Sequence, residues 1–251
     1  MSRIPDMPVA AEGGVGPVPW RVMMGHAPFV RFLWFTILIY IALAALGVLW
    51  VPVMRDLYHQ SDSLITTLPI WASVMQLVLL PVLGPLVDRT GSRPMIVVAL
   101  GIWVIHAVLW AALASGHLPL AWWVLALIQG TAGAGAAAFF LASQRLLMAT
   151  VPGQGRSHFF AMHSVALALG QGIAPVLWGL ALDRNIGWQA YGLNAHAALY
   201  LASGLLLIIT AVYSLRLSEP RALTTVEFLR ELLVRTPGRA LARASSWLEW
   251  R

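Results

Sequence analysis

Five polar side chains interrupt long apolar stretches of this sequence, and they are the residues best able to contact a solute inside a membrane. They are Gln76, His106, Gln129, His163 and Gln171. Hydrocarbon offers a polar group no partner, so each such residue either bonds to a neighbouring helix or faces a solute pathway. Gln76, His106, Gln129 and Gln171 are our candidates for a substrate pathway, and His106 and Gln171 lie closest to the middle of their stretches. The alternative for each is a hydrogen bond that only joins two helices.

Other chemistry finds little support in the sequence. The chain has no cysteine, which excludes thiolate metal sites and cysteine nucleophiles. It also lacks lysine, the G-x-x-x-x-G-K-S/T nucleotide loop, the G-x-S-x-G elbow and any His/Glu cluster with metal-ligand spacing. We therefore expect no enzyme activity, no cofactor and no metal. Asp88 and Asp183 stand at the ends of apolar stretches and none of these stretches has an acid in its middle, so proton coupling would fall to histidine or be absent.

The apolar residues form runs long enough to cross a bilayer as helices. The chain is 59% hydrophobic and 10% charged, with a mean hydropathy of +0.78, and about 20 apolar residues are enough to span a bilayer. The runs cover residues 30–53, 64–87, 94–114, 118–141, 159–182 and 195–215. We predict an all-α membrane protein with six transmembrane helices.

We divide the chain into three parts. Residues 1–28 are expected to be a cytoplasmic lead-in, 29–217 the six-helix transmembrane domain, and 218–251 a cytoplasmic tail with a basic amphipathic helix.

The distribution of arginine predicts the orientation in the membrane. All sixteen basic residues are arginines, and with the amino terminus inside only Arg55 and Arg184 fall outside. Positive charge concentrates on the cytoplasmic side of membrane proteins. The net charge of +6 is therefore explained by topology and a lipid partner, and we expect no nucleic-acid partner.

The sharpest motif is the connection between the second and third runs. It contains Gly84, Asp88, Arg89, Gly91 and Arg93. Glycine permits the positive φ of a tight reversal, an aspartate at a helix end can cap or form an ion pair, and the arginines can bind headgroups.

This spacing resembles the major facilitator superfamily, whose loop between its second and third helices reads G-x-x-x-D-R/K-x-G-x-R/K. That family is built of two six-helix halves, and this chain is similar to one carboxy-terminal half. The resemblance implies a half-length permease that moves a small solute by alternating access, as a homodimer or beside a separate amino-terminal half. It suggests a bacterial cytoplasmic (inner) membrane. The alternative function is a non-transporting scaffold or an accessory subunit of a larger membrane complex.

Two further groups of residues are expected to support such a fold. In the loop predicted at residues 144–157, Arg145 and Arg156 are candidates to pair with Asp88 as a cytoplasmic latch, as the resemblance suggests. Small residues allow close helix contacts in lipid, and proline frees a backbone carbonyl and bends a helix. The candidates for packing or kinking are Gly130, Gly133, Gly170, Gly172, Pro175 and Gly179.

Overall fold

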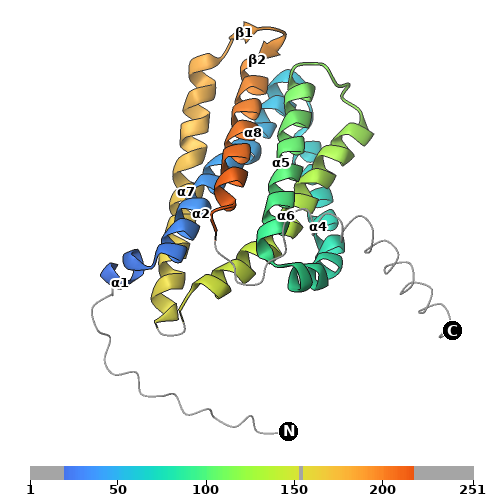
Figure 1. Cartoon of the computed structure of the whole chain (residues 1–251). Coiled ribbons are helices and arrows are strands. Elements are labelled where there is room, and N and C mark those ends of the chain that lie inside the picture. The colour runs from blue at the N-terminus through green and yellow to red at the C-terminus, as the bar shows by residue number, and fades with distance from the viewer. Residues whose placement is uncertain (1–19, 153–154, 218–251) are drawn as a thin grey trace, which may run out of the picture.

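A computed structural model describes residues 20–152 and 155–217 of the chain (Figure 1). Its helices are α1 (Trp20–Gly25), α2 (Ala27–Val48), α3 (Trp50–Pro52), a π-helical turn η1 (Val53–Leu57), α4 (Asp62–Thr90), α5 (Ser92–Ala114), α6 (Trp122–Thr150), α7 (Arg156–Asn185) and α8 (Ala195–Ser214). Two short antiparallel strands, β1 (Gln189–Ala190) and β2 (Leu193–Asn194), form a hairpin between α7 and α8.

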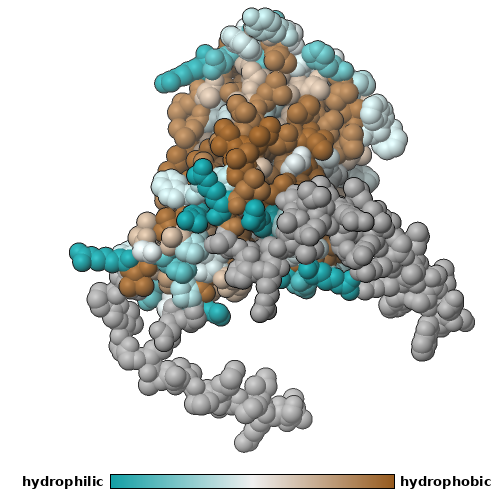
Figure 2. Space-filling view, in the orientation of Figure 1, coloured by the Kyte–Doolittle hydropathy of each residue, from teal (hydrophilic) through white to brown (hydrophobic). Residues whose placement is uncertain are grey.

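Within the described residues, six helical segments are long and apolar enough to cross a membrane. The first runs continuously through α2, α3 and η1, and the others are α4, α5, α6, α7 and α8. On the face that Figure 2 shows, a broad hydrophobic region covers the middle of the molecule, and hydrophilic residues lie toward its two ends. The predicted all-α fold with six membrane helices is confirmed.

The six long helices form an open arc. The most extensive contacts follow the order α7, α2, α8, α5, α6, α4, so α7 and α4 are its two end members. Only 11% of the most apolar segment of α4 and 22% of that of α7 is buried, against 44–50% for the other four helices. Two of the six helices therefore present most of their surface away from this bundle.

The helix ends differ from the sequence prediction at several points. The fourth run was predicted at 118–141, but α6 starts at Trp122 and continues to Thr150, so the loop predicted from residue 144 was wrong there. The connector predicted at residues 88–93 is also helical, except for Gly91. Hydropathy locates the part of a helix that suits hydrocarbon, whereas backbone hydrogen bonding continues until a residue interrupts it.

The boundaries of the lead-in and the tail stay predictions. Residues 1–19 and 218–251, including the amphipathic tail helix, lie outside the described residues.

Glycine sets the closest contacts between neighbouring helices. A Cβ added to Gly133 of α6 would lie 2.1 Å from the carbonyl oxygen of Ala72 on α4, and one added to Gly170 of α7 would lie 2.9 Å from Cβ of Tyr40 on α2. Both end members of the arc are thus held against their neighbours at a glycine. Gly130 has room for an ordinary contact, and Gly172 and Gly179 have no neighbour within 4 Å of such a Cβ.

We predict that Gly133→Ala destabilises the protein, because the added methyl group meets backbone and forces α4 away from α6. The expected loss in free energy of unfolding is roughly 1–3 kcal/mol. Reversible denaturation in mixed detergent micelles measures this loss. Gly101→Ala is the matched control, because Gly101 of α5 is exposed with open space around it. Equal stability of the two variants would contradict the close contact of α4 with α6.

Candidate functional site

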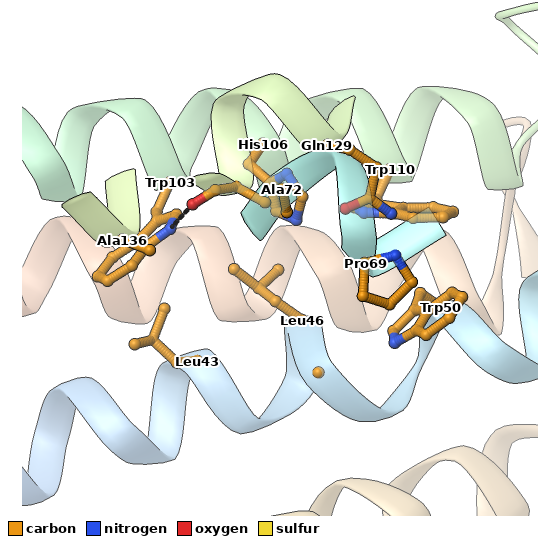
Figure 3. Close-up of a pocket in the computed structure, with 12 residues that line it drawn as sticks. Leu43, Leu46, Trp50, Pro69, Ala72, Trp103, His106, Trp110, Gln129 and Ala136 are labelled. Atoms are coloured by element: carbon orange, nitrogen blue, oxygen red, sulfur yellow. Dashed lines mark hydrogen bonds between the residues drawn. The ribbon is translucent and has the colours of Figure 1, made fainter. Parts of the chain in front are cut away.

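A cavity of about 230 Å³ lies between the first four of the six long helical segments, which are α2 with α3, α4, α5 and α6 (Figure 3). It is lined by Leu43, Leu46, Gly47, Trp50, Pro69, Ala72, Trp103, His106, Trp110, Gln129, Ala132 and Ala136. In Figure 3, Leu43 and Leu46 point from α2 across the cavity toward the side chains carried by α5. The close contact at Gly133 places α4 along the same cavity.

His106 supplies one polar group of this cavity, and only 5% of its surface is exposed. Its Nδ1 lies 2.9 Å from the carbonyl oxygen of Ile128 and 3.1 Å from Oγ1 of Thr131. A carbonyl oxygen can only accept, so Nδ1 carries the hydrogen in this bond. In the neutral ring the other nitrogen, Nε2, is then an acceptor. Nε2 has no hydrogen-bond partner among the described residues.

Gln129 supplies the second polar group. It is 7% exposed and lines the cavity from α6. Its carboxamide makes no hydrogen bond to any residue in the described part of the chain, although a buried amide normally has a partner. A donor and an acceptor are therefore available at the cavity wall.

Three tryptophans surround these polar groups. The Trp103 indole N–H donates to the carbonyl oxygen of Ala132 at 3.4 Å, and Trp110 stacks on Tyr200 with ring centroids 5.7 Å apart and planes at 10°. Trp50 of α3 is half-buried and lines the cavity on that side. Gly135 makes room for Trp103, because a Cβ there would lie 2.5 Å from the indole nitrogen.

The lining of the cavity offers hydrogen-bonding groups and aromatic surface. No acidic or basic side chain other than His106 lines the cavity. Within the described ranges, no group of three His, Asp or Glu side chains is placed to hold a metal ion. Two hydrogen-bonding groups on an aromatic wall can orient a small molecule.

The structure brings together only part of the predicted pathway. His106 and Gln129 share the cavity, whereas Gln76 of α4 is half-buried and Gln171 of α7 is exposed, and neither lines it. His163, also considered from the sequence, stacks on Phe32 with ring centroids 5.4 Å apart.

The tryptophans were missed as site residues, because indoles in apolar runs are also typical of helix packing. A usable signal was present on α5. Trp103, His106 and Trp110 follow one another at intervals of three and four residues, which places them on one face of a helix.

The motif from Gly84 to Arg93 forms a sharp corner at the end of α4 opposite Asp62. Gly84, Asp88 and Arg89 belong to α4 and Arg93 to α5, so Gly91 alone makes the reversal. Its φ of 92° is a conformation that glycine adopts without strain.

Of the two candidate latch arginines, one contacts this corner. Arg145 of α6 lies 3.4 Å from a carboxylate oxygen of Asp88 and also donates to the carbonyl oxygen of Val87. The side chain of Asp88 is 80% exposed and that of Arg145 37%. Arg156 is exposed and forms no ion pair with the described residues.

Comparison with known proteins gives one finding for most of the chain. The family model described as Major Facilitator Superfamily matches residues 32–251. A search of curated proteins found no match.

We predict that Arg145→Ala destabilises the protein more than Asp88→Asn. Arg145 places a cation on a carbonyl in the last turn of α4, and its loss is expected to cost about 1–2 kcal/mol of unfolding free energy. The exposed ion pair itself is worth about 0–1 kcal/mol, so Asp88→Asn loses less. Denaturation of both variants in detergent, with Arg156→Ala as the control, tests this order. If the two variants lost the same free energy of unfolding, the ion pair alone would account for the effect, and the hydrogen bond to Val87 would contribute nothing.

Proposed function

The chain belongs to the major facilitator superfamily, and we propose that it is a half-length transporter that moves a small solute by alternating access. In this proposal it acts as a homodimer or beside a separate amino-terminal six-helix half. The observation that carries the proposal is the open arc, whose end helices α4 and α7 are mostly unburied while the cavity lies inside it.

The exposed surface of α7 is better suited to contact with another helix than to contact with lipid. Ser164, Ala168 and Gly172 are exposed and four residues apart, so they lie along one face of the helix. Small residues at this spacing let another helix approach closely in a membrane. Gln171, beside this face, is exposed in the apolar part of α7, where lipid gives its carboxamide no hydrogen bond. A second six-helix unit would cover both features.

Prolines support the movement that alternating access requires. Pro175, a candidate for kinking from the sequence, lies inside α7. Helix α4 contains three prolines: Pro69, Pro81 and Pro85. Each proline removes a backbone hydrogen bond and weakens the helix locally. Both helices that would contact the second unit can therefore bend, and Pro69 of α4 also lines the cavity.

We further propose that the end of the bundle carrying Asp88 faces the cytoplasm of a bacterial inner membrane. Of the nine described arginines, only Arg55 and Arg184 lie at the other end. This distribution is the one expected when the positive end is inside.

The proposed interface predicts cross-links from α4 to α7 of a second unit. In a twofold dimer whose open sides face each other, α4 of one copy meets α7 of the other. Ser73 of α4 and Gly172 of α7 are both exposed and stand near the middle of their helices. The chain has no native cysteine, so oxidation of Ser73→Cys/Gly172→Cys in native membranes should give a covalent dimer. A cross-link to a different chain of similar size would identify a separate half.

Ile105→Cys/Ile208→Cys is the control, because these exposed residues lie on α5 and α8, on helices away from the ends of the arc. It should give no intermolecular product. Native mass spectrometry after mild detergent extraction measures the same assembly without cross-linking. Stable monomers, or a fixed place in an unrelated membrane complex, would contradict the two-half transporter and favour the scaffold.

A further inference from the structure

We infer that the solute bound in the cavity is an uncharged, flat molecule that carries a hydrogen-bond donor and an acceptor side by side, as an amide on an aromatic ring does. The inference rests on the proposed transport function for its biological meaning, and on the cavity itself for its chemistry.

The electrostatics of the cavity disfavour ions. None of its lining residues is an aspartate, glutamate, arginine or lysine. The charged residues nearest to the lining in sequence are Arg55 and Asp56, five and six residues after Trp50, or about 8 and 9 Å along a helix. On α4, Asp62 precedes the lining residue Pro69 by seven residues, or about 10 Å. An ion that leaves water for such an environment gains no compensating charge. A neutral solute avoids this loss.

The shape of the wall favours a flat ring. Trp50, Trp103 and Trp110 present rigid aromatic surface to the cavity, and offset-stacked or edge-on contacts between rings are favourable. Two of these indoles are fixed in place, since Trp103 is bonded to Ala132 and Trp110 is stacked on Tyr200. The surface for a ring is thus formed before the solute arrives.

The polar groups define the rest of the solute. The carboxamide of Gln129 is nine-tenths buried, lines the cavity and has no bond to the described residues, so its N–H and its oxygen are both available. The pairing that satisfies a carboxamide is another group with an adjacent donor and acceptor. Nε2 of His106 offers a further acceptor, because Nδ1 already donates to Ile128.

The test is the affinity of the full chain in lipid nanodiscs for three molecules of nearly the same shape: benzamide, benzoate and benzamidinium. Ligand-observed saturation-transfer NMR gives each Kd, and empty nanodiscs correct for binding to lipid. We expect benzamide to bind at least about tenfold more tightly than either ion.

Two variants test the role assigned to Gln129. Gln129→Leu should weaken benzamide binding about tenfold by removing its hydrogen bonds. Gln129→Glu keeps the size but adds a negative charge, so benzamidinium should become the preferred molecule. Gln144→Leu is the control on the same helix, because Gln144 is exposed and outside the cavity; it should leave all three affinities unchanged. A folded Gln129→Glu variant that keeps the original order of affinities overturns the assignment.

Failure of this inference can be separated from failure of the proposed function. Counterflow of labelled benzamide in proteoliposomes reports transport independently of binding. Binding with the expected order but without counterflow supports the site and contradicts transport. No binding of benzamide, equal affinity for the three molecules, or a preference for an ion overturns the inference, whatever the proteoliposomes show.

Discussion

Inside a bilayer every backbone N–H and C=O must find its partner within the protein, because hydrocarbon supplies none. This requirement explains why the membrane part of the chain is a set of long helices and why the hairpin of β1 and β2 stands at an end of the bundle, between α7 and α8. It also explains how the interruptions are arranged. The prolines of α4 and α7 fall in the two least buried helices, where few packed side chains resist bending. These prolines thus lie in the two end members of the arc, whereas the π-helical turn η1 lies at the end of the first span.

Because lipid tails are as apolar as leucine, close packing replaces the hydrophobic effect as the force that brings these helices together. Gly133 and Gly170 show where that packing is tightest, and each attaches an end member of the arc to its neighbour. The same geometry produces the cavity. Large side chains on α5, above all Trp103 and Trp110, occupy the space between helices, and the small residues Ala132, Gly135 and Ala136 on α6 leave room beside them. Packing and binding therefore use the same surfaces.

Much of this was predictable from the sequence, for identifiable reasons. Six apolar runs and the spacing around Gly84 and Asp88 follow local rules, so the fold class, the number of helices and the family were confirmed. Helix ends were less predictable, because α6 continues nine residues beyond its apolar run. The cavity was the hardest part. Polarity alone selected four candidates, but only His106 and Gln129 face it. Gln76 lies on α4, which lines the cavity with other residues, so rotation about the helix axis turns it away. Gln171 lies on α7, which contributes no lining residue. Both the rotation and the order of the helices are set by the neighbours that each helix packs against.

The charge of the solute and the identity of the second unit are physically linked. In a homodimer the second copy repeats the same cavity, whose lining contains no Asp, Glu, Arg or Lys. A separate half has its own sequence and can place an acid or a base opposite Gln129. The cost of moving an ion out of water would then be offset by the partner. For this chain alone, the described spans carry no acid in the middle, so proton coupling would rest on His106, whose Nδ1 holds α5 against α6 while Nε2 has no partner among the described residues. If the unit is a homodimer, coupling would depend on this histidine, whereas a separate half could supply an acid of its own.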